Sequence, residues 1–360
     1  MDAFTTAAAG DGRGIEFTGT WREYLPIAAT NALLIVCTLG IYRFWASARQ
    51  RRYLWSRTYF VDDCLEWTGT GKEMFLGFLI VIAVLAPFFL FIQFLFPALA
   101  ARGKLGAAGG VLFLFEIAIL YLGGFARFRA LRYRLSRSWW HGIRGGSDDP
   151  GWNYGGEYLG RYALTFMTMF IMFPWAVTRL WNARWNAMSF GQLQFRAKLN
   201  AKGLKRYWAL LYSLPILAII VAGVGGFALL RNSAGQPEEW RLVTLGLLVI
   251  GFFYVGIPLL TLNFFAAFYR KAAEATRIGN LEFEFDATTW QWLGLFLGNL
   301  ALAVVTLGFG LTYWGYRNWA FVMRHLHIYG TVDISELEQS TTHAPVEAEG
   351  WADAFDVGAI

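Results

Sequence analysis

Residues 16–60 read EFTGTWREYLPIAATNALLIVCTLGIYRFWASARQRRYLWSRTYF, and this stretch contains each kind of segment from which the chain is built. It opens with a short alternating segment, EFTGT. An apolar run at residues 24–42 follows and contains the sequence TLG near its end. The stretch closes with a segment rich in arginine and aromatic residues, at 41–60. Such a segment is typical of a helix among lipid headgroups, where aromatic rings settle and guanidinium groups face phosphate.

The alternating segment recurs along the chain, which indicates an internal repeat. Residues 16–20 and 66–70 read EFTGT and EWTGT, and each is followed at the same offset by an acid, Glu23 or Glu73. The alternation of apolar and polar residues predicts short strands. Three weaker copies keep the spacing: QFRAK at 194–198, EFDAT at 284–288, and Ile143-Arg144-Gly145, in which glycine replaces the aromatic residue.

The composition of the whole chain places it in a membrane. Of its 360 residues, 56% are hydrophobic and only 16% are charged, and the mean hydropathy is +0.40. Ordinary soluble chains have about 25% charged residues. This composition excludes a disordered chain, a collagen-like fibre, a disulfide scaffold and an ordinary cytosolic enzyme. Cys37 and Cys64 lie in unlike surroundings, so no disulfide is expected, and residues 1–14 lack the pattern of a cleaved signal peptide.

Seven apolar elements are candidate membrane helices, since a span takes about 20 residues. They are residues 24–42, 74–100, 105–126, 162–177, 207–230, 242–269 and 290–314. Only short linkers separate the second from the third and the fifth from the sixth, so each pair is predicted to form a helical hairpin. The chain is therefore predicted to be an all-α polytopic membrane protein with short strand-like segments on its basic side.

The same pattern predicts three regions along the chain. Residues 1–13 form an N-terminal tail, and residues 14–330 form a single transmembrane domain built from the repeats. Residues 331–360 contain seven acids and no Lys or Arg, so they are predicted to be an acidic, disordered tail.

The distribution of positive charge bears on which elements cross the membrane. If all seven cross, the 31 Lys and Arg residues divide almost evenly between the two sides, which the positive-inside rule disfavours. If only the two hairpin pairs cross, all but four of the 31 lie on one side, together with all five strand segments. We therefore predict that the first, fourth and seventh elements are re-entrant or interfacial, each with an early break. Matched TLG sequences at 38–40 and 306–308 are candidate breaks.

The first repeat also carries a specific resemblance. From FTGTWREYLPIAATNALLIVCTLGIYRFWASARQRRYLWSRTYF to LEWTGT the chain resembles the YjgN-like family of bacterial inner-membrane proteins, a family of unknown function. HGIRGGSDDPGW at 141–152 and GWADAFDVGAI at 350–360 add to the resemblance, which covers roughly residues 14–329 and that tail. The chain departs from the family at Gly145, where an aromatic residue is usual. The resemblance implies a multi-pass protein of the bacterial inner membrane and supplies no reaction.

No pattern of catalytic or metal-binding residues stands out, and we expect neither enzymatic activity nor a cofactor. GTGKE at 69–73 resembles the end of a phosphate loop, but Glu66 and Glu73 stand where such a loop needs glycine and Ser or Thr. His325 and His327 share one face of a strand, yet no further metal ligands lie near them in the sequence. We therefore interpret the two histidines as surface residues.

Glu116 is the candidate functional residue within the membrane, because it is the one acid well inside an apolar element. A charge at that depth costs roughly 2.5–3.5 kcal/mol on insertion scales. Glu116 is therefore either retained for function, such as proton-coupled transport, or protonated and hydrogen-bonded to a neighbouring helix.

The basic segments are the second candidate site, since arginines near an anionic leaflet attract its lipids. We expect anionic membrane lipids as partners and no nucleic acid, because the interleaved aromatic residues fit the membrane interface. The candidate contacts are Arg49, Arg51, Arg52, Arg129, Arg132 and Arg134.

Three functions remain open at this stage. Internal repeats with broken apolar segments favour a transporter or channel, which would line a polar path with Glu116, Asn31 and Asn299. The alternative is a lipid-interacting or scaffold protein of the inner membrane, which would have a dry bundle and a flat charged face. An intramembrane enzyme is the third.

Overall fold

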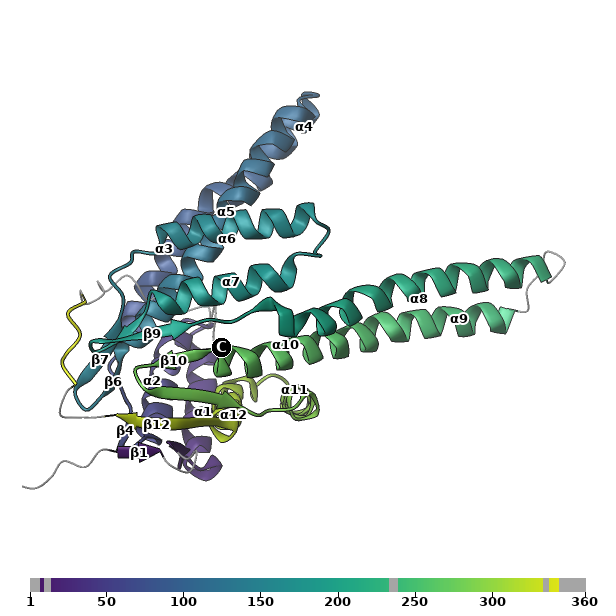
Figure 1. Cartoon of the computed structure of the whole chain (residues 1–360). Helices are drawn as coiled ribbons and strands as arrows, with labels where there is room; N and C mark the ends of the chain where they lie inside the picture. Colours follow the sequence, from purple (N-terminus) through teal and green to yellow (C-terminus); the bar gives the residue numbers. More distant parts are fainter. Residues whose placement is uncertain (1–6, 10–13, 233–238, 333–336, 343–360) are drawn as a thin grey trace, which may run out of the picture.

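The computed structural model describes residues 7–9, 14–232, 239–332 and 337–342, and it is mostly helical with two β-sheets at one end (Figure 1). The helices are α1 (Trp21–Cys37), α2 (Arg43–Ser56), α3 (Gly71–Leu90), α4 (Phe96–Ala101), α5 (Leu105–Arg137), α6 (Trp152–Met167), α7 (Phe173–Asn186), α8 (Lys205–Asn232), α9 (Glu239–Gly251), α10 (Ile257–Glu274), α11 (Thr289–Val305) and α12 (Leu311–His325). Two π-helical segments, η1 (Phe91–Leu95) and η3 (Phe252–Gly256), join α3 to α4 and α9 to α10, and a 3-10 turn, η2 (Ala201–Leu204), precedes α8.

The strands are short and all antiparallel. They are β1 (Ala7–Ala9), β2 (Ile15–Phe17), β3 (Thr58–Phe60), β4 (Asp63–Cys64), β5 (Glu66–Trp67), β6 (Ser138–Trp140), β7 (Ile143–Gly146), β8 (Ser189–Phe190), β9 (Leu193–Ala197), β10 (Thr276–Ile278), β11 (Leu281–Phe285) and β12 (Leu326–Val332). One sheet has the order β1-β12-β11-β10-β9-β8-β7-β6-β5, and the other has the order β2-β3-β4.

Each helical hairpin is inserted between two strands that pair with each other. In the first unit β2 pairs with β3, and Phe17 lies opposite Thr58. The same pairing joins β5 to β6, β7 to β8, β9 to β10, and β11 to β12. Five such units follow one another, and β-hairpin turns connect them. Because paired strands lie side by side, every helical hairpin must begin and end at the sheet.

Short and long hairpins alternate along the five units (Figure 1). The short hairpins are α1 with α2, α6 with α7, and α11 with α12. The long hairpins are α3–α5 and α8–α10. The first helices of the short hairpins have 17, 16 and 17 residues. At 1.5 Å per residue these helices reach about 25 Å, which is short of the roughly 30 Å of a bilayer core.

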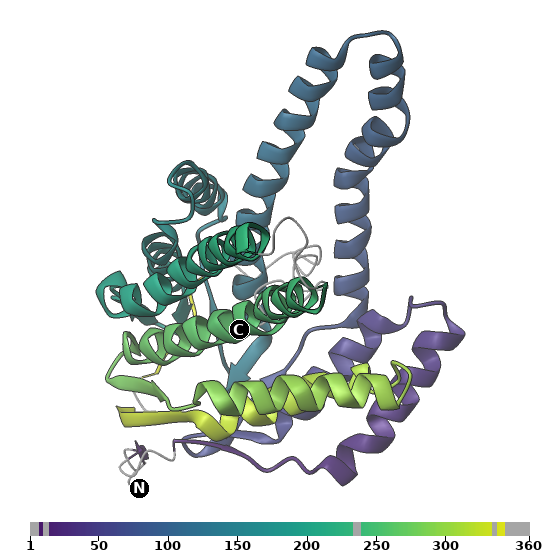
Figure 2. The ribbon, with the colours of Figure 1, turned by 90° about the vertical axis from the view of Figure 1, so that its right-hand side faces the viewer.

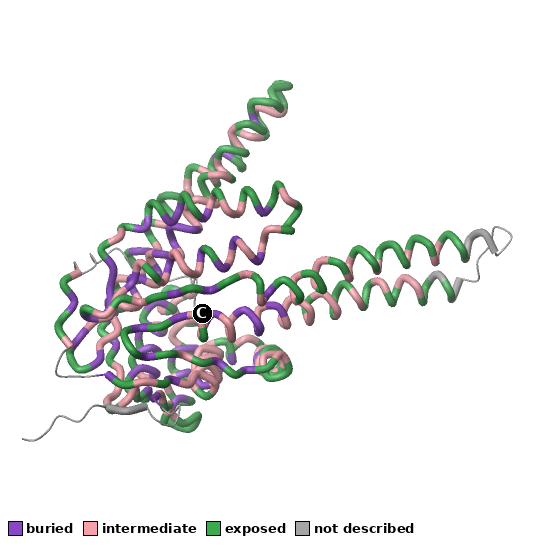
Figure 3. The backbone as a smooth tube through the Cα atoms, viewed as in Figure 1, coloured by how far each residue is buried: buried purple, intermediate pink, exposed green. Residues whose placement is uncertain are grey.

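Four helical arms in the described part of the chain are long and apolar enough to cross a membrane. They are Gly71–Ala101, Leu105–Arg137, Ala201–Ala228 and Val243–Glu274, the two arms of each long hairpin. No more than 11% of each apolar segment is buried within the protein, and the long hairpins are mostly green and pink in Figure 3. Their apolar side chains are therefore free to face lipid.

A threonine turn reverses the chain at the tip of every short hairpin. In the first hairpin the Thr38 hydroxyl donates to the Leu34 carbonyl at 2.7 Å and accepts from the Tyr42 amide at 2.9 Å. Thr168 and Thr306 make the same two bonds in the other hairpins. The hydroxyl thus satisfies one backbone group at the end of the first helix and one at the start of the second.

The three threonine turns share a backbone conformation but not a sequence. Leu39 and Gly40 have φ of 51° and 91°, and Leu307 and Gly308 have 51° and 92°. Met169 and Phe170 occupy the same places with φ of 50° and 67°. The TLG sequences therefore identified two turns, while the third was missed because Phe170 stands where the others have glycine. The expected break is present in all three short elements.

The five units close into a ring, so that the last packs against the first (Figure 2). Tyr24 Oη donates to the Thr312 carbonyl at 3.0 Å, and Trp319 Nε1 donates to Thr58 Oγ1 at 2.9 Å. Similar bonds cross other boundaries. Trp55 Nε1 donates to Ser138 Oγ, and Trp181 Nε1 donates to Thr276 Oγ1. Indole N–H groups near the sheet thus link neighbouring units.

Two aspects of the predicted fold need correction. The description as all-α is too narrow, because the strand-like segments pair into two sheets. The strands of the first unit belong to β2-β3-β4, and the nine-stranded sheet joins the other four units. The seven apolar elements are not seven helices either. The elements at 24–42, 162–177 and 290–314 each contain a threonine turn. The first ends at the N-cap of α2, and the other two run from one helix into the next.

The fourth repeat is also shifted by two residues from its predicted register. The Lys198 amide donates to the Ala275 carbonyl, as the Thr18 amide does to the Arg57 carbonyl, and Asn200 caps the next turn as Thr20 caps α1. Ala197 therefore takes the place of Phe17. Because a strand repeats every two residues, this shift keeps the same side chains on the same face.

Segments from both predicted tails lie against the sheet. Residues 7–9 form β1, which pairs with the end of β12. Residues 337–342 lie along β7, where Gln339 Oε1 accepts from the Arg144 amide and Arg144 Nη2 donates to the Thr342 carbonyl. A Cβ at Gly146 would meet Thr342 Oγ1, which gives a steric reason for glycine there. The remainder of the acidic tail, at 343–360, lies outside the described residues.

Because both ends of every hairpin lie at the sheet, we expect Ser56 and Gln194 on one side of the membrane and Lys104 on the other. All three are exposed. In a background with Cys37→Ala and Cys64→Ser, single cysteines at these positions would be labelled with an impermeant maleimide in intact and in opened cells. Labelling of Ser56→Cys and Gln194→Cys from opposite sides would contradict this topology.

Candidate lipid-facing site

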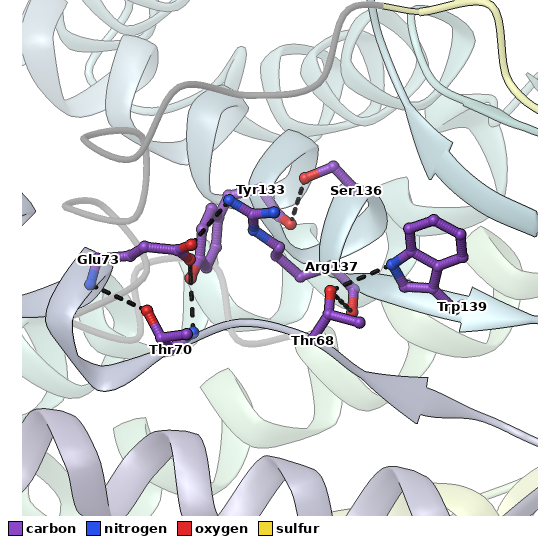
Figure 4. Close-up of polar contacts among 7 residues, drawn as sticks. All are labelled: Thr68, Thr70, Glu73, Tyr133, Ser136, Arg137 and Trp139. Atoms are coloured by element: carbon purple, nitrogen blue, oxygen red, sulfur yellow. Dashed lines mark hydrogen bonds and ion pairs between the residues drawn. The ribbon is translucent and has the colours of Figure 1, made fainter.

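A polar clamp joins the two arms of the first long hairpin at the sheet. It consists of Glu73, Tyr133 and Arg137 (Figure 4). Tyr133 Oη donates to Glu73 Oε2 at 2.7 Å, and Arg137 Nη2 lies 2.9 Å from Glu73 Oε1. Thr70 completes the capping box with Glu73 at the start of α3. The carboxylate therefore ties the first turn of α3 to the last turn of α5.

The first short hairpin has the same clamp, in Glu23, Tyr53 and Arg57. Tyr53 Oη lies 3.2 Å from Glu23 Oε2, and Arg57 Nη2 lies 3.2 Å from the same oxygen. Burial raises the pKa of Tyr53 to about 12, with Glu23 adding to the shift, so the phenol is a neutral donor at neutral pH. This copy is more open to water, since the Glu23 and Arg57 side chains are 45% and 47% exposed.

Only two of the six arginines that were predicted to contact lipid are exposed on the surface of the protein. Arg49 and Arg52 on α2 are exposed, whereas Arg51 is buried and its guanidinium lies over the Trp67 ring at 5.0 Å. On α5, Arg132 is buried and Arg129 and Arg134 are half-buried. The predicted lipid contacts are therefore divided between the surface and the interior.

The arginines of α5 make specific contacts inside the protein. Arg132 Nη1 donates to the Asp149 carbonyl at 2.9 Å, and the Arg129 guanidinium lies 5.1 Å from the centre of the Phe125 ring. These contacts join α5 to the loop before α6 and to its own aromatic neighbours. Their role is at least partly structural.

A groove between α10 and α11 opens from the sheet toward the lipid-facing surface. It has a volume of about 480 Å³. Leu259 and Leu293 line its apolar part, and Arg270 and Asp286 lie at its polar end. Arg270 Nη1 donates to the Ala287 carbonyl at 2.7 Å, which fixes the guanidinium at that end. An apolar wall that leads to a fixed cation matches an acyl chain followed by a phosphate.

Glu116 lies on the outer surface of α5 and is exposed. Within the described part of the chain it makes no hydrogen bond or ion pair, and Gln93 on the preceding arm is exposed as well. Asn31 donates to the Ala46 carbonyl, and Asn299 donates to Asn318 Oδ1 at 2.8 Å, each within its own short hairpin. Within the described part of the chain, none of these hydrogen bonds joins one of the three polar residues to another.

With the geometry described, comparison with known proteins identifies the family. The family described as "Bacterial protein of unknown function (DUF898)" matches residues 13–354. The chain belongs to this family. The resemblance to the YjgN-like family is confirmed as well, since 68 residues of this DUF898 protein are 34% identical to the inner membrane protein YjgN of Salmonella typhimurium strain LT2. That match covers 19% of the chain and 17% of the relative. No solved structure matches the chain.

Sequence reasoning recognised the acids of this DUF898 protein but missed their partners. Glu23 and Glu73 stand at one offset from their strands, and Tyr and Arg recur four residues apart at 53 and 57 and at 133 and 137. Comparison of these two spacings would have predicted the clamp. No sequence spacing marks Arg270, because its apolar groove forms only when α10 and α11 pack against each other. Among the described residues there is no group of three potential metal ligands.

The two clamps predict unequal effects of the same substitution. Glu73→Gln removes an ion pair whose side chains are only 12% and 20% exposed, so we expect a loss of about 2 kcal/mol in the free energy of unfolding. Glu23→Gln affects the more exposed pair and should lose less than about 1 kcal/mol. Denaturant unfolding in detergent, followed by circular dichroism, measures both. Equal losses would show that burial of the clamp does not determine its strength.

The exposure of Glu116 predicts that an apolar side chain stabilises α5. Glu116→Leu removes a polar group from the lipid-facing surface and should raise stability by up to roughly 2.5–3.5 kcal/mol. Gln93→Leu, on the same hairpin, is the matched control and should give a smaller gain. Unfolding in bilayer-like micelles measures the change. A loss of stability in Glu116→Leu would indicate that a partner covers this carboxyl in the membrane.

Proposed function

We propose that this protein is a multi-pass inner-membrane protein that binds glycerophospholipid, with the phosphate at Arg270 and an acyl chain along Leu259 and Leu293. The observation that carries the proposal is the groove between α10 and α11, where an apolar wall leads to a cation. Asp286 lies at the same end of the groove, and its Oδ2 is 3.3 Å from His327 Nε2. A carboxylate there suits a headgroup that also carries an amine. The name of the YjgN relative and the four apolar arms support the inner membrane as location.

The short hairpins support a lipid-binding role because their tips are apolar and exposed. Leu39 is 94% exposed, Met167 80% and Leu307 89%. Residues of this kind at the end of a hairpin about 25 Å long favour insertion into one leaflet. The groove and the basic layer then lie at the depth of the headgroups in that leaflet. Anionic lipids are the natural partners of the exposed Arg49 and Arg52, each worth about 1 kcal/mol near such a surface.

A transporter or channel is the second candidate. The internal repeat favours it, since transporters are commonly built from repeats. Transport also requires polar groups along one path through the membrane. Glu116, Asn31 and Asn299 lie apart, and the four long arms bury little of their surface against one another. The geometry therefore favours lipid binding over transport.

The proposal predicts that Arg270→Gln reduces the lipid that remains bound after purification. Full-length protein would be purified in mild detergent, and bound phospholipid would be quantified by native mass spectrometry. We expect a severalfold loss in Arg270→Gln, because the charge-assisted bond to phosphate is removed. Leu293→Trp should give a similar loss by filling the groove.

The matched control is Arg277→Gln on β10, where the arginine is 59% exposed and pairs with Glu282 outside the groove. It should retain the wild-type lipid content. Equal lipid content in the wild type and in the Arg270→Gln, Leu293→Trp and Arg277→Gln variants would exclude the groove as a phospholipid site. Loss in Arg49→Gln/Arg52→Gln alone would instead assign lipid binding to the exposed arginines of α2.

A further inference from the structure

A second cationic site lies inside the protein, around Arg184. This residue is on the last turn of α7, two residues before the helix ends. Its side chain is more than nine-tenths buried, with 8% exposed. Its Nε is sealed from solvent without a hydrogen-bond partner, and the guanidinium makes no hydrogen bond or ion pair with the described part of the chain. The guanidinium carbon lies 5.6 Å from the centre of the Trp181 ring.

The nearest ionisable groups do not neutralise Arg184. They are the phenols of Tyr154 and Tyr269 and the guanidinium groups of Arg134 and Arg127. Burial raises the pKa of Tyr154, so its phenol stays neutral at neutral pH. Burial also lowers the pKa of Arg184, the two phenols oppose that shift, and the two arginines add to it. Arginine nevertheless remains protonated in proteins.

A hydrogen bond orders the same cluster from the side of α5 and α6. Arg127 Nη1 donates to Tyr158 Oη at 2.7 Å, and the Arg127 guanidinium carbon lies 5.1 Å from the centre of the Tyr158 ring. Arg127 is therefore held by a neutral phenol. Around Arg184 on α7, two further arginines on α5 and two phenols on α6 and α10 thus lie close enough to interact electrostatically with it.

The buried Arg184 needs a negative charge, because no acid in the described part of the chain is among its electrostatic neighbours. Removing one ion from water costs several kcal/mol even after the protein relaxes, and like charges nearby raise that cost. A cation–π contact returns only part of that cost. Tyrosine hydroxyls and arginine N–H groups together are the donors that bind phosphate-class oxyanions. We propose that the cluster of Arg184, Arg127, Arg134, Tyr154 and Tyr269 binds a phosphate-class oxyanion.

The depth of this site restricts the source of the anion. Arg184 lies just before β8, Arg134 just before β6, and Tyr154 in the first turn of α6. The site therefore occupies the layer between the sheet and the hairpins, where lipid headgroups lie if the long hairpins span. A lipid phosphate and free phosphate present the same chemistry there. The site is separate from the groove, which is formed by α10 and α11.

The test compares Arg184→Met with Arg179→Met on the same helix, where Arg179 is exposed. Delipidated full-length protein in detergent would be titrated with inorganic phosphate and, separately, with phosphatidylglycerol micelles, and its unfolding temperature recorded. We expect at least one probe to raise the unfolding temperature of the wild type and of Arg179→Met. The same probe should bind Arg184→Met at least about tenfold more weakly than it binds the wild type, because a charged donor is lost.

The outcomes separate the source of the anion and the alternatives. A response to phosphatidylglycerol alone assigns the site to a lipid headgroup, and a response to phosphate alone assigns it to a free anion. Without any probe, Arg184→Met should be as stable as the wild type or more stable, because methionine replaces an uncompensated charge. A loss of stability in Arg184→Met with no Arg184-dependent binding would overturn the proposal.

Two further variants distinguish anion binding at Arg184 from lipid binding in the groove and from occupation of the site by the acidic tail. In Arg270→Gln the phosphate response should persist even if groove lipid is lost, so the two proposals can fail separately. In the full chain, neutral replacement of Glu347, Glu349, Asp353 and Asp356 should leave probe binding unchanged. Probe binding that appears only in this neutralised chain would mean that the acidic tail occupies the site, which would also overturn the proposal.

Discussion

The pairing of the strands on either side of each helical hairpin is the constraint on which the rest of the structure depends. When β5 pairs with β6, the arms α3 and α5 must return to one edge, and the same holds in every unit. A unit can then cross the membrane twice or not at all. The short hairpins are therefore confined to the sheet side, whatever their apolar composition. Hydrophobicity gives a segment its affinity for lipid, and the backbone bonds of the sheet determine where it returns.

The sequence predicted the features that arise locally and missed those that arise between units. The strand repeat, the two long hairpins and the breaks at Thr38 and Thr306 follow from spacing and composition. The turn at Thr168 was missed because Phe170 stands where the other two turns have glycine, and a lone threonine is too common to indicate a turn. The shift of the fourth repeat was hidden because two residues restore the same face of a strand. Ring closure between Tyr24 and Thr312 joins positions at opposite ends of the chain and has no local signal.

The basic segments show why composition alone cannot identify binding residues in this fold. Arginine interleaved with aromatic residues fits a headgroup layer, and the segments lie next to the sheet. Each of these helices nevertheless has a neighbouring unit on one side, so Arg51 and Arg132 are buried while Arg49 and Arg52 remain exposed. Only the contacts between units distinguish these side chains.

The alternation of short and long hairpins has a mechanical consequence for the surrounding bilayer. If the four long arms span the bilayer, the six helices of the short hairpins share the sheet-side leaflet with them, whereas only the four arms continue into the other. At a helix diameter of about 10 Å, six extra helices add on the order of 500 Å² of cross-section to one leaflet. An inclusion of this wedge shape has the least elastic energy where the sheet-side leaflet is convex. In that placement the fold would favour curved membrane without any ligand.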